Sequence, residues 1–359
     1  MIKAAIIGCG KIADQHADII TTLPGSEIVA VCDNEPLMAQ QIAERFNVSK
    51  HFSNVQEMLD VVKIDVVHIT TPPQSHFFLA KLCLNSGLNV YVEKPFTINL
   101  AEAEELIHLA QTNNLKITVG HNAQFSPAAI RMRQLIKDGF LGGIPVHMES
   151  YYCYDFGDAR YAKAFLSDKT HWLRSLPGTL THNIISHGIS KIAEFLTADN
   201  PKVIAHGFIS PLLKSLNEHD IIDELRVIIN DSEHTTAYFT FSSQIKPSLH
   251  QFRIYGPKNG LIVDDDNQTV IKIRGNKYKS YVNHFIPPFT FAKQYMANGI
   301  NNINKFLKGD FHMGYGMQYL INAFYRSISE EKSLPISYKE IILTAKIMDE
   351  IFKQIRPNK

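Results

Sequence analysis

The sequence lacks paired cysteines, and this excludes a disulfide-stapled fold. Its four cysteines, Cys9, Cys32, Cys83 and Cys153, form no CxxC motif and do not have the spacing of a zinc site. The 16 histidines do not cluster at ligand spacing either, so no metal centre is expected. Scattered thiols in apolar segments favour a reducing compartment, and we expect a cytoplasmic protein.

The sequence also lacks a strong excess of charge of either sign and long hydrophobic runs. The 36 basic residues nearly cancel the 35 acidic ones, and no run of Lys or Arg is present, so nucleic acid is not expected as a partner. The longest apolar stretches, such as Ile2–Cys9 and Asp65–Thr70, fall far short of the ~20 residues of a membrane-spanning helix. Because the chain begins with a predicted strand, we expect neither a signal peptide nor a membrane association.

A regular alternation of strands and helices is present in the first third of the chain. Near-continuous Val/Ile strands separated by helices predict a doubly wound parallel sheet covered on both faces, that is, a Rossmann-type α/β domain. The expected elements are Ile2–Gly8, a helix to about Thr22, Glu27–Cys32, Pro36–Phe46, Asp65–Thr70, Gln74–Asn85, Leu88–Val92, Leu100–Thr112 and Lys116–Val119.

After about Phe125 the predicted strands become longer and alternate between apolar and polar residues. This pattern predicts an open, mostly antiparallel sheet in a second, α+β domain. The expected strands are His147–Tyr154, Val203–Ile209, Glu224–Ile229, Thr235–Ser242, Leu249–Tyr255 and Gly260–Asp264. A final helix is expected after Ser337 as its N-cap. With 359 residues, two domains are expected, and an exposed sheet face of this size predicts a homodimer or homotetramer.

The first strand runs into a glycine-rich turn and then a helix, which is the pattern of a dinucleotide-binding site. Gly8 permits the tight turn, Gly10 lets the backbone approach a pyrophosphate, and Ala13 allows close helix packing. The backbone N–H groups at Lys11 and Ile12 begin the helix and face the phosphates. Asp33 ends the second strand, where a carboxylate binds the adenosine ribose and repels a 2′-phosphate, so NAD is favoured over NADP. A doubly wound domain with an empty crevice is the alternative.

Further motifs follow at strand ends, and together they identify a family resemblance. TPPQSH spans Thr71–His76, EKP spans Glu93–Pro95, and PGTLTHNIISH ends at His187. With GCGKIA at the N-terminus, this set resembles the glucose-fructose oxidoreductase, inositol dehydrogenase and MocA family over essentially the whole chain. The segment LPIS before the last helix is similar to the part of the family that packs back on the Rossmann domain. The expected domains are therefore 1–121 for NAD, 122–332 for substrate and dimerisation, and 333–359 for this helix.

The resemblance implies hydride transfer between nicotinamide and a carbon of a sugar, cyclitol or related alcohol, with Lys94 close to the reacting hydroxyl. The family's second signature, Asp followed four residues later by His, corresponds here to Asn183 and His187. On one helix these two side chains share a face. Since Asn183 cannot take a proton, it would orient a hydroxyl, and the base would be His187 or Lys94. A surface lysine and a core histidine are the structural alternatives.

Other positions that match the family's site complete the set of candidate residues. For the cofactor these are Thr71, Pro72, His76, Glu93 and Lys94, beside the glycine-rich turn. For the substrate they are His121, Asn122, Tyr151, Trp172, Arg174 and His182, although core packing is the commoner use of such aromatic residues. The segment Tyr281–His312 is unusually aromatic, which fits a flap around a bulky substrate or a peripheral packing helix.

These observations predict a cytoplasmic NAD(H)-dependent oxidoreductase for a secondary alcohol of a sugar, cyclitol or nucleotide sugar. Two alternatives stay open. One is a lyase or glycosidase that oxidises its substrate only transiently. The other is a regulatory protein that senses a sugar or NAD without turnover.

Overall fold

The computed structural model describes residues 1–155, 168–231, 234–275, 278–279, 281–309, 311 and 314–355. It divides into two compact units. Unit 1 contains Met1–His121 and Met317–Lys346, and unit 2 contains Asn122–Gly316 and Ile347–Lys359. Each unit is built around its own sheet, and the two are described separately below.

Unit 1 contains a six-stranded sheet, sheet A, in the order β3-β2-β1-β4-β5-β6. All its strand pairs are parallel, and β1 lies at the point where the strand order reverses. This confirms the predicted Rossmann architecture. The strands are β1 (Ile2–Ile7), β2 (Ser26–Cys32), β3 (His51–Phe52), β4 (Val66–Ile69), β5 (Asn89–Val92) and β6 (Ile117–Val119).

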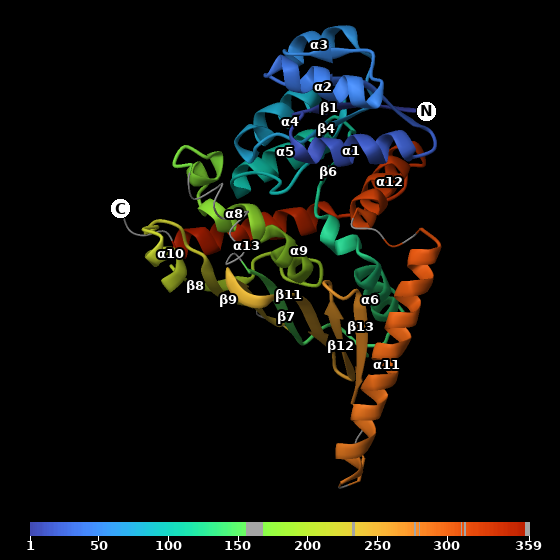
Figure 1. The fold of residues 1–359 in the computed structure, drawn as a ribbon, viewed down its shortest axis with the longest axis vertical. Coiled ribbons are helices and arrows are strands. Elements are labelled where there is room, and N and C mark those ends of the chain that lie inside the picture. The colour runs from blue at the N-terminus through green and yellow to red at the C-terminus, as the bar shows by residue number, and fades with distance from the viewer. Residues whose placement is uncertain are drawn as a thin grey trace. The chain divides into compact units, whose positions relative to one another are not determined.

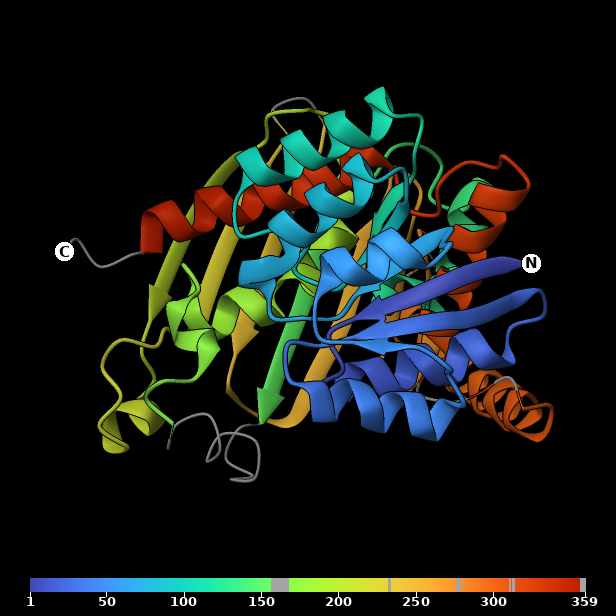
Figure 2. The same cartoon turned by 90° about the horizontal axis from the view of Figure 1, so that it is seen from above.

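Helices cover both faces of sheet A, which explains why its strands are almost entirely apolar. α1 (Lys11–Thr22) packs against α2 (Pro36–Phe46), while α4 (His76–Asn85) packs against α5 (Leu100–Thr112) on the other face (Figure 2). α3 (Val55–Val61) and the short β3 were not expected from the sequence.

Unit 2 contains a seven-stranded sheet, sheet B, in the order β13-β12-β11-β7-β10-β9-β8 (Figure 1). All neighbours are antiparallel except β7 and β10, so the prediction of a mostly antiparallel sheet is confirmed. The strands are β7 (His147–Asp155), β8 (Lys202–Phe208), β9 (Glu224–Asn230), β10 (Thr236–Ser242), β11 (Gln244–Tyr255), β12 (Asn259–Asp264) and β13 (Thr269–Arg274). Of these, β13 was not expected.

The two faces of sheet B differ. Helix α9 (Ser186–Ala193) packs on β7 and β10, where Gly188 lets the helix approach Phe239 and Tyr152 closely. The opposite face is exposed. Along its cross-strand row, the exposed fractions are 65 % for Ile204, 40 % for Ile228 and 44 % for Tyr238.

The remaining helical segments of unit 2 connect and flank the sheet. They are η2 (Asn122–Phe125), α6 (Pro127–Lys137), η3 (Trp172–Ser175), α8 (Thr179–Ile184) and α10 (Pro211–Ser215). In unit 1 the short η1 (Pro73–Ser75) precedes α4. Among the described residues, no helix is long and apolar enough to span a membrane.

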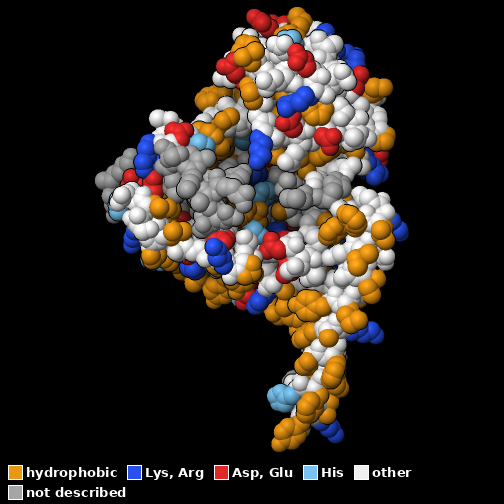
Figure 3. Space-filling view, in the orientation of Figure 1, with side chains coloured by type: hydrophobic (Ala, Val, Ile, Leu, Met, Phe, Trp, Pro, Cys, Tyr) orange, Lys and Arg blue, Asp and Glu red, His pale blue; other side chains and the backbone are white. Residues whose placement is uncertain are grey.

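Helix α11 (Val282–Leu307) binds to sheet B through polar residues and exposes its apolar ones. The side-chain amide of Asn298 pairs with both the N–H and the C=O of Val270, and Gln294 does the same with Lys272. Hydrophobic side chains cover much of the rest of the helix (Figure 3), including Phe289, which is 78 % exposed. This segment was expected to be a flap or a packing helix; it is a long helix attached to the free edge of β13, while Asp310 and His312 lie outside the described residues.

The C-terminal helices differ from the expected domain plan. α12 (Tyr315–Ser329) falls within the range expected for the second domain, but from Met317 onward it groups with unit 1, because Phe324 packs on Tyr91. α13 (Tyr338–Ile355) has the predicted cap, since the Ser337 hydroxyl accepts a hydrogen bond from the Glu340 N–H. Only its residues up to 346 group with unit 1; the rest groups with unit 2.

Candidate active site

The glycine-rich turn between β1 and α1 leaves room for a ligand next to the backbone. Gly8 has a φ of +95°, and a Cβ there would lie 2.6 Å from the Thr71 side chain. At Gly10, by contrast, a Cβ would have no described protein atom within 4 Å, and this residue caps α1 without a side-chain hydrogen bond. A helix N-terminus beside an open backbone suits a pyrophosphate. The residues present therefore fit a dinucleotide.

Asp33 lies at the end of β2 with its carboxylate fixed by backbone groups. Oδ2 accepts a hydrogen bond from the Cys9 N–H (2.6 Å), and Oδ1 accepts one from the Glu35 N–H (2.9 Å). The carboxylate thus joins the glycine-rich turn to the end of β2 and retains lone pairs for ribose hydroxyls. Burial and the nearby Asp33 raise the pKa of the Cys9 thiol to about 12, so this cysteine is an inert filler of the turn.

His76 was expected to bind the cofactor, and in the structure its ring contacts the protein backbone. Its ring is fully buried, with Nε2 2.9 Å from the Thr71 carbonyl and Nδ1 2.9 Å from the Pro95 carbonyl. Because both ring nitrogens contact backbone, His76 joins the loop after β4 to the loop after β5. It therefore positions Thr71 and Pro72, which remain candidates for the cofactor.

The EKP turn follows β5 and places Lys94 next to a buried carboxylate. Glu93 Oε2 accepts a hydrogen bond from the Lys94 N–H (3.1 Å), and the Lys94–Pro95 peptide is cis. Burial lowers the pKa of Lys94, whereas the charge of Glu93 raises it. Burial likewise lowers the pKa of the neighbouring His121 to about 3, so His121 is neutral at physiological pH.

Glu93 was also expected to contact the cofactor. In the structure its carboxylate is buried in unit 1, where it pairs with His16 and with the Lys94 N–H. Burial alone would raise its pKa, yet a hydrogen bond from His16 and the charge of Lys94 hold that pKa below its usual value. Gly120 makes room for it, since a Cβ there would lie 2.7 Å from Glu93 Oε1. Glu93 is thus a buried anion that supports the turn carrying Lys94.

In unit 2, Asn183 and His187 lie close in sequence but in two helices. α8 ends at Ile184 and α9 begins at Ser186, with Ile185 between them in a right-handed conformation. The single helix expected from the sequence is therefore interrupted, although the chain continues in the same helical sense. His187 is 9 % exposed and Asn183 is half-buried.

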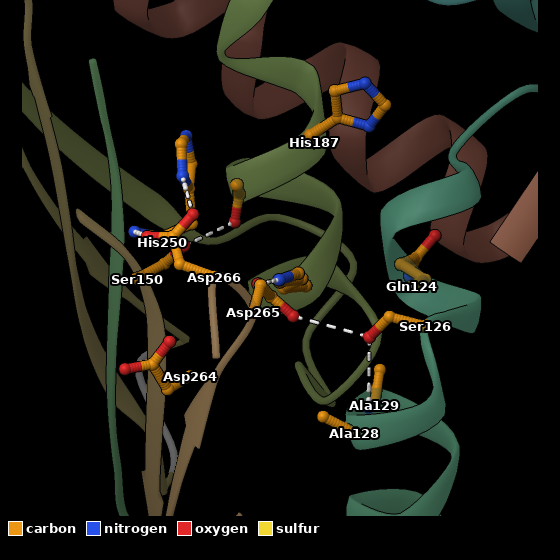
Figure 4. Close-up of polar contacts among 12 residues, drawn as sticks. Gln124, Ser126, Ala128, Ala129, Ser150, His187, His250, Asp264, Asp265 and Asp266 are labelled. Carbon is orange, nitrogen blue, oxygen red and sulfur yellow. Dashed lines mark hydrogen bonds and ion pairs between the residues drawn. The ribbon is translucent and has the colours of Figure 1, made fainter. Parts of the chain in front are cut away.

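The surroundings of His187 include an aromatic cluster that the sequence did not predict. The Tyr152 ring lies 5.6 Å from that of His187 and 4.6 Å from that of His250. His250 Nδ1 is 2.8 Å from the Asp266 carboxylate, while the His187 ring lies on the side of α9 away from Asp265 (Figure 4). In the part of the chain that the structure describes, no group of three His, Cys, Asp or Glu side chains is arranged to hold a metal ion.

Comparison with known proteins identifies the family. Residues 2–121 match the model of an oxidoreductase family with an NAD-binding Rossmann fold, the glucose-fructose oxidoreductase, inositol dehydrogenase and MocA family. The first 121 residues of the chain therefore resemble the NAD-binding domain of this family. The recognition made from GCGKIA, TPPQSH and EKP is thereby confirmed.

Relatives within the family differ in how much of the chain they match. Trans-1,2-dihydrobenzene-1,2-diol dehydrogenase of Xenopus tropicalis is 23 % identical over 98 % of both proteins. D-glucoside 3-dehydrogenase of Escherichia coli is 32 % identical over 40 % of this chain, and the match spans 42 % of that enzyme. Several curated relatives are thus matched over less than half of their length. The structure of UDP-N-acetylglucosamine 3-dehydrogenase GnnA from Acidithiobacillus ferrooxidans has the same fold, with a TM-score of 0.74, 19 % identity and coverage of 99 % and 98 %.

Three residues that the family resemblance implied as substrate contacts have other partners. Tyr151 lies on the exposed face of sheet B with its hydroxyl on Glu149 (3.0 Å), opposite to the face where Tyr152 meets His187. Successive strand residues point to opposite faces, so choosing Tyr151 over its neighbour reversed the side. Arg174 forms a two-pronged ion pair with Glu218 (2.9 and 3.1 Å).

The third of these residues, His182, is buried and stacks on Phe352 of α13 at 4.7 Å. Asn122 and Trp172 are half-buried and remain candidates, and the Trp172 ring stacks on His171. Gln124 donates to the Ser190 carbonyl (3.3 Å) and so joins η2 to α9.

Sequence reasoning missed the residues that surround Glu93. His16 lies on the buried face of α1, and His68 interrupts the apolar strand β4. One signal in the sequence could have indicated these residues: each histidine stands at a position where the hydrophobic pattern calls for an apolar residue.

Proposed function

We propose that this protein is an NAD(H)-dependent dehydrogenase or reductase that acts on a secondary alcohol of a sugar, cyclitol or nucleotide sugar. The observation that carries the proposal is the pairing of an open Gly10 turn with a lysine beside a buried carboxylate at the end of β5. The E. coli and A. ferrooxidans relatives are named as sugar and nucleotide-sugar dehydrogenases, which supports this substrate class.

The cofactor is NAD rather than NADP. Gly8, Gly10 and the N–H groups of Lys11 and Ile12 would hold the pyrophosphate, with Thr71 and Pro72 on the neighbouring loop. Ala13, whose N–H donates to the Gly10 carbonyl (2.9 Å), would allow the close packing of the helix. Asp33 would accept the ribose hydroxyls, and its fixed negative charge would repel a 2′-phosphate. When bound, NAD supplies the hydride acceptor or donor.

Each unit by itself carries residues proposed for substrate binding and proton transfer. Lys94, whose pKa is lowered by burial, orients the hydroxyl and takes its proton. His187 is the second candidate for proton transfer, and Asn183 holds a hydroxyl through its amide. His121, Asn122 and Trp172 line the substrate site, and Tyr152 replaces Tyr151 in this role.

We propose that the protein is a homodimer or homotetramer that associates through the exposed face of sheet B. Apolar side chains from three neighbouring strands support this, because a contiguous exposed row of that kind favours association. We also propose a cytoplasmic location, since all four cysteines are buried free thiols, which suits a reducing compartment.

The experiment is a search for NADH formation, by its near-ultraviolet absorbance, with NAD and a panel of sugars, cyclitols, sugar acids and nucleotide sugars. We expect one class to react, and Lys94→Ala to lower kcat about 100-fold or more. Lys50→Ala, an exposed lysine of the same unit, is the matched control. NAD binding without any NADH formation would reject the dehydrogenase in favour of transient oxidation or a sensor.

A further inference from the structure

Four buried polar side chains from four different elements of unit 1 form one connected row. His16 of α1 lies between Glu93 of the turn after β5 (Nε2 to Oε1, 3.0 Å) and His68 of β4 (Nδ1 to Nδ1, 2.9 Å). His68 Nε2 is in turn 2.8 Å from the hydroxyl of Tyr325 in α12. We call these four residues the buried network.

The network is inside the protein, where each hydrogen bond has to be matched. His16 and His68 are fully buried, and Glu93 and Tyr325 are 6 % and 5 % exposed. The Tyr91 ring stacks on His68 at 4.9 Å, which closes the row from one side. Because water cannot replace a lost partner here, removal of one member leaves the next member unsatisfied.

The protonation of three members of the row follows from their surroundings. An ionised Glu93 only accepts, so His16 Nε2 donates to it. Burial raises the pKa of Tyr325, and burial together with His16 lowers the pKa of His68, so Tyr325 keeps its proton and His68 is neutral at physiological pH.

Glu93 connects the network to the EKP turn. One carboxylate oxygen accepts from His16 and the other from the Lys94 N–H. The carboxylate therefore has both a fixed position and a fixed charge next to Lys94. The titratable groups that face Glu93 are His16 from α1, His76 from α4, His121 after β6, and Tyr91 and Lys94 from its own segment.

Stability alone is a poor reason for this arrangement. Buried ionic and polar networks often contribute no more to folding than apolar side chains of similar volume would. The positions concerned lie in α1 and β4 among apolar neighbours such as Ala13 and Val67, where an apolar residue would pack readily. The placement of the network directly behind Lys94 points to a role in the site.

We propose that His16, His68 and Tyr325 are positioning residues for Lys94, and that they act by holding the Glu93 carboxylate in place and charged. The inference rests on the proposed function, because that function gives Lys94 its role. The effect of the network on the protonation of Lys94 can nevertheless be measured without any enzymatic turnover.

The test measures how the rate of acetylation of Lys94 depends on pH in the purified full-length protein, by peptide mass spectrometry. Glu93→Gln removes the charge directly and should lower the midpoint for Lys94 by about one pH unit or more. His16→Leu should shift it in the same direction, because Glu93 loses its donor. Tyr325→Phe should give a smaller shift, and His16→Gln, which keeps an N–H donor, should restore most of the wild-type value.

Thr118→Val is the matched control, since Thr118 is a fully buried residue of the same sheet outside the network. It should leave the midpoint unchanged. If the two His16 variants and Tyr325→Phe all keep the wild-type midpoint while Glu93→Gln shifts it, the network is only structural and the proposal is wrong. No shift in Glu93→Gln would also overturn it.

Measurements of enzymatic turnover distinguish a failure of this inference from a failure of the proposed function. In an active enzyme, His16→Leu should lower kcat at least tenfold with little change in the KM for NAD, because the cofactor site is untouched. Absence of activity in the wild-type protein would refute the proposed function, whereas the acetylation midpoints would still decide the role of the network. Should His16→Leu fail to fold, Tyr325→Phe carries the test, and an unchanged midpoint in that variant would overturn the proposal.

Discussion

At the scale of single residues, the glycines around the cofactor turn have different physical reasons to be there. Gly8 needs both its left-handed φ of +95° and the space that the Thr71 side chain would deny to a Cβ. Gly10 needs neither for folding, because a Cβ there would meet no described atom within 4 Å. A Cβ at Gly10 would therefore point into open space, where a ligand can approach the backbone.

This contrast gives a direct test of the dinucleotide site. Gly10→Ala should fold with an unchanged melting temperature but bind NAD at least tenfold more weakly, since its methyl group would occupy the place of the pyrophosphate. Gly8→Ala should instead lower the melting temperature by several degrees. Calorimetric titration with NAD and thermal unfolding measure the two effects. Unchanged NAD affinity in Gly10→Ala would place the cofactor elsewhere.

The sequence located part of the site because its motifs follow strand ends. Gly10, Asp33 and Lys94 could be proposed from spacing and resemblance. His16 and His68 could not be proposed in this way, because the hydrogen bonds that join them come from segments far apart in the sequence and form only on folding. The sequence also could not show whether Tyr151 or Tyr152 faces α9, since alternation along a strand shows that two faces exist but not which of them is covered.

At the scale of elements, long periodic segments were predictable and short or irregular ones were not. The apolar strands β1 and β4 and helix α5 carry enough residues to show their period. β3 has two residues, and the amphipathic pattern of α12 gives no hint that its partner is sheet A, more than 200 residues away in sequence. Helix α11 was obscured by Pro287 and Pro288 in its first turns.

The attachment of α11 leads to a prediction for Asn298, which is buried and pairs with both backbone groups of Val270. Asn298→Ala should lower the free energy of unfolding by about 1–2 kcal/mol and speed amide exchange in β13 and α11. Asn304→Ala, at an exposed position of the same helix, should change neither. Urea unfolding and hydrogen exchange provide the readouts, and equal behaviour of the two variants would contradict the role given to Asn298.

At the scale of the whole molecule, the exposed face of sheet B determines the expected assembly. Ile228 and Tyr238 are direct cross-strand neighbours on that face. Two carboxylates introduced there would have to be desolvated in an interface between two copies, at a cost of several kcal/mol. The face is therefore the place where substitution should separate protomers without unfolding them.

We expect light scattering to give the wild-type protein a mass that is a multiple of 40.6 kDa. The double variant Ile228→Glu/Tyr238→Glu should shift to 40.6 kDa. Phe78→Glu, at a residue of α4 that is 70 % exposed, should keep the wild-type mass. A wild-type protein of single-chain mass would refute the proposed assembly.

The side-chain amides of α11 that bind β13 also protect the protein against aggregation. An edge strand offers unpaired N–H and C=O groups, on which another chain can add a strand and begin a cross-β assembly. Gln294 and Asn298 saturate these groups at Lys272 and Val270, in the way that a further strand would. The helix therefore protects the free edge of sheet B, and any form of the protein cut short before residue 282 would expose a template for fibril growth.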